Sequence, residues 1–374
     1  MTSIRFLTRW KLALSACLLA AAGIAGAETL KIGGIFTQEG PAAAYGIDAL
    51  NGARIAIDEI NQKGGIKGRK LELDLHDDKG DTATAAALMR KIAADSEVPA
   101  VLFAPRSPVL IALSKMAPQI GISLIGIGSS SPWPGEFNEW TFRFSQVDSV
   151  VAQALWPQIK PKFNVQTAAT IYAVDDEWAN SMADLTDKLA PANGIKMIGK
   201  ESFRTKDTDF RAALTKLSAN PPDLLVVIGL ENEASLIMKQ ARQLGIKSRF
   251  LGYSSFSSPK LLELAGPAAE GSVTGVAFMQ DVDRPVTQAF VKAYKSRYSK
   301  DAPANAAHAY DAVLVLSKAL EAAPKLDRES VRISLAGLKQ VEGATGRLFM
   351  SGKGDAQREV FLVQIENGTY ARLK

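Results

Sequence analysis

Cysteine and histidine are nearly absent from this chain of 374 residues, which has one cysteine, Cys17, and two histidines, His76 and His308. A single cysteine excludes a disulfide scaffold and every zinc or iron–sulfur site that needs several thiolates. Two histidines leave little for histidine-based metal binding or acid–base chemistry. The sequence therefore predicts a protein without a metal and without a cofactor.

Acidic residues are missing from residues 1–27, which carry three bases. The mostly apolar stretch Leu12–Ile24 follows these bases, and the segment ends in Ala25-Gly26-Ala27. Basic, apolar and small residues in this order are typical of a secretory signal. The apolar stretch is also shorter than the about 20 residues that a membrane span needs. We predict cleavage before Glu28 and a periplasmic protein.

Loss of this segment lowers the surplus of basic over acidic residues from five to two, which gives no basis for nucleic-acid binding. Cys17 would leave with the signal, so we expect no disulfide in the mature chain. One alternative stays open, because Leu14-Ser15-Ala16-Cys17 resembles a lipoprotein cleavage box and would make Cys17 a lipid anchor. We favour the soluble exported form, since only five residues separate Lys11 from Cys17 and the apolar run continues beyond.

Strand-like and helix-like segments alternate along the remaining chain. The predicted strands are Leu30–Phe36, Leu71–His76, Ala100–Phe103, Ser123–Ile127, Thr170–Ala173, Leu224–Gly229 and Phe250–Tyr253, and the predicted helices are Ala43–Ile60, Thr82–Ala94, Val109–Ile120, Ser181–Ala190 and Ala234–Leu244. Strands separated by helices form parallel sheets covered on both faces. There are too many units for one sheet, so we predict an α/β fold with two doubly wound, Rossmann-like lobes. Near the C-terminus, Asn367-Gly368 between two strand-like runs predicts a β-hairpin.

Common enzyme motifs are also missing, including G-x-x-x-x-G-K-[ST], H-E-x-x-H and a G-x-G-x-x-G after the first strand. The nearest approach to a nucleophile elbow, Gly128-Ser129-Ser130-Ser131-Pro132, has proline where G-x-S-x-G needs glycine. Adjacent acids at Asp77-Asp78 and Asp175-Asp176 are typical of solvated turns or helix caps. We expect His76 at a solvated strand end and His308 in helix packing. The sequence predicts a protein that is not an enzyme.

Two loops carry groups that suit an anion. Ser107 follows a predicted strand as a candidate N-cap, and Pro108 suits the first helical position. Free N–H groups and the helix dipole at that point attract a carboxylate. The next strand ends in Gly128-Ser129-Ser130-Ser131, and both loops would lie at carboxyl ends of strands, where ligands bind in open sheets. A helix cap and a turn alone would also explain these residues, so both interpretations stay open here.

Seven short motifs are spaced along the body of the chain. They are Asn51-Gly52-Ala53-Arg54 with Ile57 and Ile60-Asn61, Gly64-Gly65-Ile66-Lys67-Gly68, Asp77-Asp78, Asp207-Thr208-Asp209-Phe210, Gln240-Ala241-Arg242-Gln243-Leu244-Gly245, Ala269-Glu270-Gly271 and His308-Ala309-Tyr310-Asp311-Ala312. In this order they resemble the periplasmic leucine/isoleucine/valine-binding family of ABC-importer receptors, over essentially all of residues 28–374. The resemblance implies two lobes joined by three hinge crossings, with the ligand in the cleft between them. Lobe 1 would be 28–148 plus 278–357, and lobe 2 would be 149–277 plus 358–374.

The resemblance also implies ligand-binding residues in lobe 1. The family's serine that binds the ligand's α-carboxylate matches Ser107. The backbone position in the next loop matches Gly128, and the hydroxyl residue two positions further matches Ser130. The aromatic residue of the first strand–helix loop matches Tyr45.

In lobe 2 the match is less complete. Trp178 matches the aromatic residue that this lobe contributes, but Leu230 stands where the family has a tyrosine. Ser254 stands where the family has the glutamate that pairs with the α-ammonium, and Glu231 lies one residue beyond the matched position Leu230. Recognition of the ammonium group is therefore the weakest part of the resemblance.

The function that the resemblance implies is capture of a small apolar carboxylate, in the class of branched-chain and hydrophobic amino acids, by lobe closure. The partners would be the membrane permease and ATPase subunits of an ABC importer, and the chain would be a monomer. Two alternatives stay open. One is a receptor for a non-amino ligand such as an aromatic or aliphatic acid, and the other is a ligand-sensing protein of the same fold.

Overall fold

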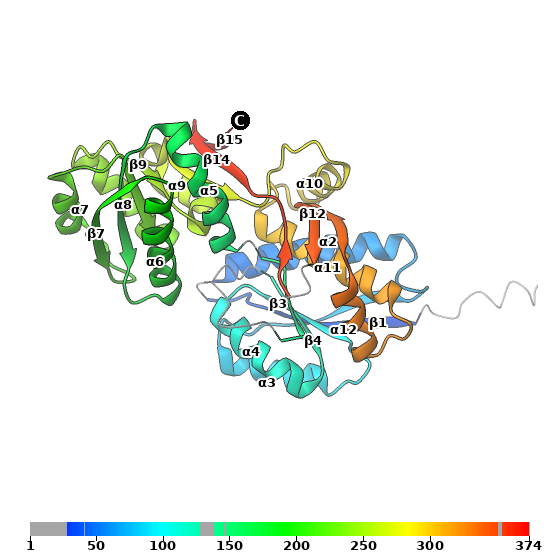
Figure 1. Ribbon diagram of the computed structural model, residues 1–374. Helices are drawn as coiled ribbons and strands as arrows, with labels where there is room; N and C mark the ends of the chain where they lie inside the picture. Colours follow the sequence, from blue (N-terminus) through cyan, green and yellow to red (C-terminus); the bar gives the residue numbers. More distant parts are fainter. Residues whose placement is uncertain (1–27, 41, 128–137, 146, 351–353, 374) are drawn as a thin grey trace, which may run out of the picture.

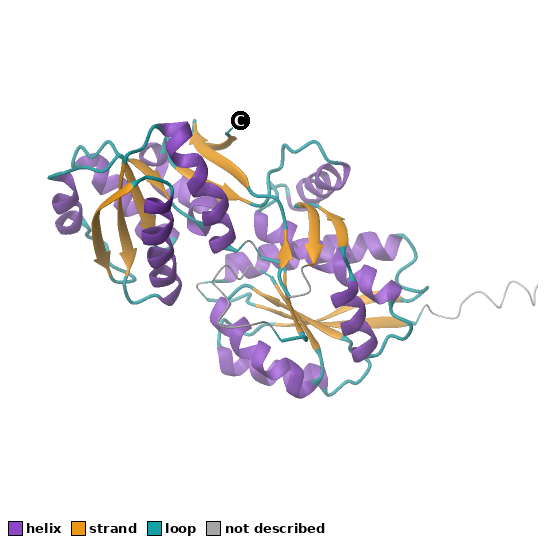
Figure 2. Cartoon of the chain, in the orientation of Figure 1, coloured by secondary structure: helices purple, strands orange, loops and turns teal. Residues whose placement is uncertain are grey.

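The protein consists of two α/β lobes that lie side by side in Figure 1. The computed structural model describes residues 28–373 except 41, 128–137, 146 and 351–353. One lobe contains the first five strands together with the orange segments of the chain, and the other contains the green segments and the red C-terminal hairpin (Figure 1). In both lobes helices cover the two faces of a sheet (Figure 2), as the alternating pattern of the sequence predicts.

Lobe 1 is built on a five-stranded sheet in the order β2-β1-β3-β4-β5, with every neighbouring pair parallel. Its strands are β1 (Thr29–Phe36), β2 (Lys70–His76), β3 (Ala100–Ala104), β4 (Ser123–Gly126) and β5 (Thr141–Arg143), and the helices between them are α2 (Ala43–Gln62), α3 (Thr82–Ala93) and α4 (Ser107–Ile120). The order reverses between β1 and β3, because β2 lies on one side of β1 and β3 on the other. This reversal creates a topological switch point.

The same lobe receives a later part of the chain. It comprises α10 (Pro285–Tyr298), α11 (Ala304–Ala322), α12 (Arg328–Gly337) and a small antiparallel sheet of β11 (Gln340–Gly343), β12 (Gly346–Met350) and β13 (Ala356–Gln357). Helices α2 and α11 cross at Gly52, where a Cβ atom would lie 1.9 Å from the carbonyl oxygen of Ala306. Only a residue without a side chain allows this approach.

Alternate side chains of the lobe 1 strands point to opposite faces and are buried on both. Leu30, Ile32 and Leu102 belong to the core under α2 and α11, whereas Ile35 and Val101 belong to the core under α3 and α4. Both faces are therefore covered, which explains why these strands read as continuous apolar runs in the sequence.

Lobe 2 is built on a seven-stranded sheet in the order β15-β14-β10-β9-β8-β6-β7. Its strands are β6 (Thr167–Ala173), β7 (Lys196–Phe203), β8 (Leu224–Ile228), β9 (Arg249–Leu251), β10 (Val273–Val276), β14 (Phe361–Glu366) and β15 (Thr369–Arg372), and its helices are α5 (Asp148–Phe163), α6 (Glu177–Ala192), α7 (Arg211–Ser218), α8 (Glu231–Gln243), α9 (Pro259–Ala265) and the short 3₁₀ segments η2 (Ser254–Ser257) and η3 (Gly266–Ala269). Strands β6 to β10 are parallel, and β14 is antiparallel to both its neighbours. A second switch point lies between β6 and β8.

The chain runs between the two lobes along three connections. The first leads from β5 to α5, the second returns from β10 to α10, and the third leads from β13 to β14. Buried residues before the first connection, and between the second and third, belong to the lobe 1 cores, and those elsewhere form the lobe 2 core. None of the helices in the described ranges combines the length and apolar character that a membrane span requires.

Each strand and helix predicted from the sequence is present with the predicted type, and the limits differ by a few residues. The C-terminal hairpin is also confirmed, with positive φ angles of 51° and 71° at Asn367 and Gly368. Helices α5, α7, α9, α10 and α12 escaped prediction, and so did strands β5, β7, β10, β11, β12 and β13. The strands β5, β7 and β10 are short or carry polar residues in alternation too weak to separate from a loop, and their pairing with distant strands stabilises them.

Two expectations about polar residues are wrong. Asp78 is fully buried rather than solvated, and its Oδ1 accepts hydrogen bonds from Thr37 Oγ1 at 2.7 Å and from Gly80 N at 3.1 Å. His76 is only 16% exposed, and its Nε2 lies 3.0 Å from Asp74 Oδ1. For Asp78, the loop after the neighbouring strand β1 supplies Thr37, a contact that local sequence does not reveal. His308 is buried in α11, as expected for helix packing.

Candidate functional site

The predicted binding residues of lobe 1 follow strands that are neighbours in the sheet. Tyr45 comes after β1, Ser107 comes directly after β3, and these two strands flank the switch point. Gly128 and Ser130 come after β4, which pairs with β3, and both lie outside the described residues. Parallel strands bring their carboxyl ends to one edge, so the structure places Tyr45 and Ser107 at the edge where open sheets bind ligands.

Ser107 occupies the first residue of α4 rather than the N-cap. The cap position belongs to Arg106, whose backbone is extended at φ −82° and ψ 124° and whose carbonyl accepts a hydrogen bond from Leu110 N. The predicted N-cap role of Ser107 is therefore wrong by one residue. Ser107 still lies in the first turn, where backbone N–H groups have no partner within the helix and the helix dipole is positive.

Arg106 adds a positive charge beside this helix end and was not singled out by the sequence. Its guanidinium donates a hydrogen bond to the carbonyl of Gly80, in the loop after β2, and its side chain is exposed. The field of this cation reinforces that of the helix dipole at the α4 terminus. A basic residue directly before the candidate serine is the signal that could have identified it.

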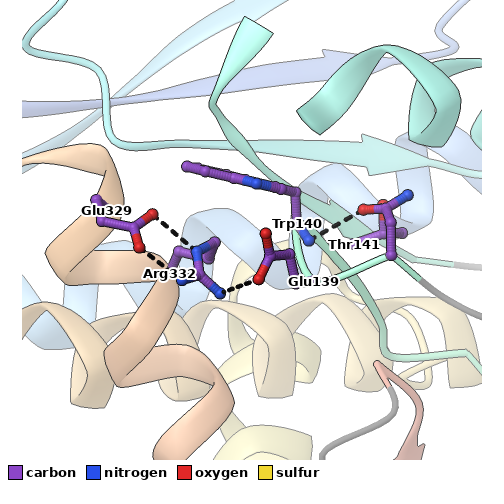
Figure 3. Close-up of polar contacts among 6 residues, drawn as sticks. Glu139, Trp140, Thr141, Glu329 and Arg332 are labelled. Carbon is purple, nitrogen blue, oxygen red and sulfur yellow. Dashed lines mark hydrogen bonds and ion pairs between the residues drawn. The ribbon is translucent and has the colours of Figure 1, made fainter. Parts of the chain in front are cut away.

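The connection that carries Gly128 and Ser130 is fixed at both ends. At its start, Ile127 N donates to Phe103 O at 2.8 Å. At its end, Arg332 of α12 pairs with Glu139 at 3.1 Å and lies 5.3 Å from the centre of the Trp140 ring (Figure 3). The same guanidinium also binds Glu329 of its own helix at 2.6 Å (Figure 3). The loop ends therefore have defined positions relative to β3 and β4.

Tyr45 lies in the first turn of α2 and is half-buried. The start of this helix packs tightly on the end of β1, because a Cβ atom at Gly46 would lie 1.8 Å from Thr37 O. Thr37 is held in turn by Asp78, and Gln38 N donates to Asp77 Oδ1 at 2.9 Å. The loops after β1 and β2 thus brace each other, and this bracing sets the position of Tyr45.

The lobe 2 residues repeat the arrangement. Trp178 follows β6, Leu230 follows β8 and Ser254 follows β9, and these three strands are consecutive in the sheet. Trp178 is half-buried in the first turn of α6, where its Nε1 donates to Asp148 Oδ2 at 2.9 Å. Asp176 caps that helix by accepting from Ala179 N at 2.8 Å. An indole fixed by a hydrogen bond presents a rigid apolar surface.

Leu230 is the N-cap residue of α8 and is 57% exposed, an unusual position for a large apolar side chain. Glu231 follows it and is only 8% exposed. Burial raises the pKa of the Glu231 carboxyl, while a hydrogen bond with the Ser258 side chain opposes the rise. Ser258 ends the loop that begins with the half-buried Ser254. Glu231 therefore contacts the loop in which the family glutamate was expected.

Large apolar side chains remain exposed at the carboxyl-end edges of both sheets. Ile47 is 41% exposed in the first turns of α2, Val150 is 46% exposed at the start of α5, and Val174 is 40% exposed after β6. Leu230 belongs to the same set. Exposed apolar residues gathered around candidate binding loops indicate surfaces that become covered by a ligand or by another part of a protein.

Among the residues that the structure describes, no group of three or more His, Cys, Asp or Glu side chains could hold a metal ion. The groups that do gather are hydroxyl and N–H donors with a cation in lobe 1, and an indole, a leucine and a buried carboxyl in lobe 2. This combination suits a small molecule with an anionic end and an apolar body.

Comparisons with known proteins find relatives over almost the whole chain. A family model described as periplasmic binding protein matches residues 29–369. The chain is similar to the leucine-, isoleucine-, valine-, threonine- and alanine-binding protein of Pseudomonas aeruginosa, with 29% identity over 92% of this chain and 94% of the relative. It is 30% identical to Leu/Ile/Val-binding protein homolog 1 of Brucella melitensis, over 91% of each chain.

Among solved structures, the chain is similar to the branched-chain amino acid transporter substrate-binding protein LivJ of Streptococcus pneumoniae in complex with isoleucine. The identity is 28%, the TM-score is 0.83, and the match covers 92% of this chain and 99% of the other.

Proposed function

Because the chain belongs to the periplasmic binding protein family, we propose that it captures a small apolar carboxylate, in the class of branched-chain and hydrophobic amino acids, for an ABC importer. A solute-binding role and the absence of enzymatic activity follow from the family. The observation that carries the ligand class is the pairing of a hydroxyl- and N–H-bearing edge in lobe 1 with an apolar edge in lobe 2. Both relatives at about 30% identity are named for leucine, isoleucine and valine, and the name of one adds threonine and alanine.

In this proposal lobe 1 holds the carboxylate. Ser107 and the first-turn N–H groups of α4 donate hydrogen bonds to it, Gly128 and Ser130 contribute from the next loop, and Arg106 adds long-range attraction. Tyr45 contacts the apolar part from the loop after β1. Each charge-assisted hydrogen bond contributes about 1–3 kcal/mol.

Lobe 2 then covers the ligand by closing on lobe 1. Trp178, Leu230 and Ser254 contribute to the closing surface, and ligand favours closure because only then do both lobes contact it. In this proposal the present conformation is the open one. The exposed apolar side chains of Ile47 and Leu230 support this assignment, since a closed arrangement would bury them.

The ammonium group of an amino acid would pair with Glu231. The Glu231 carboxyl is buried against the loop that replaces the family glutamate with Ser254, and burial raises its pKa although Lys260 opposes the rise, so a ligand cation would be a favourable partner. The same observation supports a second candidate, an aromatic or aliphatic acid without an ammonium group. In that case Glu231 would keep Ser258 as its partner and would not touch the ligand.

The lobe limits, location and partners belong to the same proposal. The lobes would comprise 28–148 plus 278–357 and 149–277 plus 358–374, which agrees with the division of buried residues between the cores. Cleavage before Glu28 would release a monomer into the periplasm, where the closed form would meet the permease and ATPase subunits of the importer.

A thermal-shift panel tests the proposal. The panel compares leucine, isoleucine and valine with benzoate, hydroxyphenyl acids and aliphatic acids, and it includes leucinamide, which lacks the carboxylate. A ligand at a hundred times its Kd stabilises the fold by about 2.7 kcal/mol. We expect a rise in Tm with carboxylates and none with leucinamide. Stabilisation by leucinamide equal to that by leucine would overturn the anion site.

Glu231→Gln separates the two candidate ligand classes. If Glu231 pairs with an ammonium, the variant loses affinity for leucine by tenfold or more, because the ligand cation becomes buried without a partner. If the natural ligand lacks an ammonium, benzoate or an aliphatic acid binds the variant and the wild type equally well. Calorimetric titration of both proteins with both ligands decides between them.

A further inference from the structure

The third connection between the lobes carries two adjacent charged residues, Arg358 and Glu359, that bind the other two connections. It runs from β13 in lobe 1 to β14 in lobe 2 and contains only residues 358–360. A segment this short has few dihedral angles, so contacts made by its side chains bear directly on the relative position of the lobes.

Arg358 ties the third connection to the first. Its Nη2 donates to Phe144 O at 2.8 Å, directly after β5, and its Nη1 contacts Thr345 Oγ1 at 3.3 Å. The arginine is half-buried, and removal of its guanidinium from water lowers its pKa to about 10, an effect that the nearby Asp311 opposes. Asp311 is fixed by the backbone N–H groups of Ala344 and Thr345. The tie is therefore anchored in the core of lobe 1.

Glu359 ties the third connection to the second. Its Oε2 accepts from Nη2 of Arg284, the last residue before α10, where the second connection ends. Its Oε1 lies 3.8 Å from Nη2 of Arg372 in β15. The Arg284 guanidinium is close to the turn between β11 and β12, because a Cβ atom at Gly346 would lie 2.2 Å from its Nη1. Glu359 thus sits between an arginine of lobe 1 and an arginine of lobe 2.

We propose that the Arg284–Glu359 ion pair, supported by Arg358, stabilises the open arrangement and so sets the apparent affinity for ligand without touching it. The inference rests on the lobe closure proposed above. Closure rotates the connections relative to one another, so a contact between two of them differs in strength between the two states. A difference in the free energy of this contact between the two states changes the fraction of protein that is closed. The apparent Kd is the intrinsic Kd of the closed form divided by that fraction.

Arg284 and Glu359 suit a test because both are partly exposed, at 34% and 44% of their side chains, so their loss leaves the cores intact. An exposed ion pair contributes little to stability. The equilibrium between the open and closed arrangements nevertheless responds to a small change in free energy. We expect Glu359→Gln to raise the closed population about threefold.

The measurement is the distance between spin labels in the two lobes of the ligand-free protein. The labels are attached to cysteines that replace the exposed Lys115 of α4 and Lys188 of α6. The background carries Cys17→Ser, since Cys17 is the only cysteine of the chain. We expect Glu359→Gln and Arg284→Gln to shift the distance distribution in the direction that saturating ligand shifts the wild type. Arg284→Lys, which keeps the charge, should preserve the wild-type distribution.

The control is Arg347→Gln, which breaks a comparable exposed ion pair with Glu342 at 2.9 Å within the β11–β12 hairpin and so removes no contact between two connections. It should leave the distances unchanged. Titration with L-leucine and with benzoate should show a Kd about threefold lower for Glu359→Gln. Distances equal in Glu359→Gln, Arg347→Gln and wild type would overturn the inference. Shifted distances without binding of either ligand would instead contradict the proposed ligand class. They would still support the role of the Arg284–Glu359 ion pair in the balance between the open and closed arrangements.

Discussion

The two lobes present different chemistry on the same architecture. Each has a switch point in a doubly wound sheet, between β1 and β3 in lobe 1 and between β6 and β8 in lobe 2. At these points lobe 1 offers Ser107 at the N-terminus of α4, and lobe 2 offers Trp178 and Leu230. The fold therefore places a candidate site at the same position in each lobe. The side chains make the position in lobe 1 suitable for a charged group and the position in lobe 2 suitable for an apolar group.

The loops are also held differently. In lobe 1 the loops after β1 and β2 brace each other through Thr37 and Asp78, both fully buried. In lobe 2 Trp178 donates instead to Asp148, at the start of α5 where the first connection ends. In the proposed mechanism lobe 1 would therefore act as a rigid anchor built before ligand arrives, and lobe 2 would present a surface that closure completes.

Ser107→Ala gives the largest expected effect on this comparison. Loss of a hydrogen bond to the ligand carboxylate should weaken binding by about 1–3 kcal/mol, and Ser130→Ala should do the same. Calorimetry with the best carboxylate of the panel measures the change. Ser114→Ala is the matched control, because Ser114 lies in the same helix and its Oγ donates to Ile111 O. Equal affinities for all three variants would remove the anchor from lobe 1.

Trp178→Ala tests the apolar role of lobe 2. The lost contact with the ligand's apolar body should weaken binding by about 1–2 kcal/mol. Trp178→Phe keeps an aromatic ring but removes the Nε1 donor to Asp148, so it separates ring contact from positioning. A large loss with phenylalanine would show that the hydrogen bond matters more than the ring. An unchanged affinity with alanine would contradict the role given to this lobe.

Glu231→Gln should stabilise the fold at neutral pH. Because burial raises the pKa of the Glu231 carboxyl, its contribution to stability is complete below the unfolded-state pKa and is lost as pH rises through the folded-state value. Glutamine stays neutral, so we expect a gain of about 1 kcal/mol at pH 7 that disappears near pH 4. Urea unfolding across this range measures it, with Glu263→Gln at an exposed position of α9 as control. Lower stability of Glu231→Gln at pH 7 would contradict the assignment.

Arg332→Ala should have the smallest effect, restricted to lobe 1. The variant loses the ion pairs to Glu139 and Glu329 and the contact with Trp140, which together contribute about 1 kcal/mol (Figure 3). Hydrogen exchange should accelerate near β5 and stay unchanged in β6 and β8. Acceleration in both lobes would show that the lobes do not respond independently.

Local sequence predicted the elements well and their contacts poorly. The apolar run of β3 and the Asn367-Gly368 turn depend on a few neighbouring residues, so their types could be inferred directly. The one-residue error at Ser107 arose because Arg106 takes the extended cap conformation without a side-chain hydrogen bond. The burial of Asp78 depends on Thr37, 41 residues earlier, and no local pattern encodes such a distance.

The order of residues alone determined that this protein alternates strands and helices, lacks the thiols and motifs of common enzymes, and carries small hydroxyl-bearing loops after two strands. These properties follow from backbone preferences and side-chain chemistry that act within a few residues. Only the tertiary structure decided that β1, β3 and β4 are neighbours, that Glu231 contacts the Ser258 loop, and that Arg358 and Glu359 join three connections. Such contacts join residues far apart in the chain, and they form only where burial of the two cores brings those residues together.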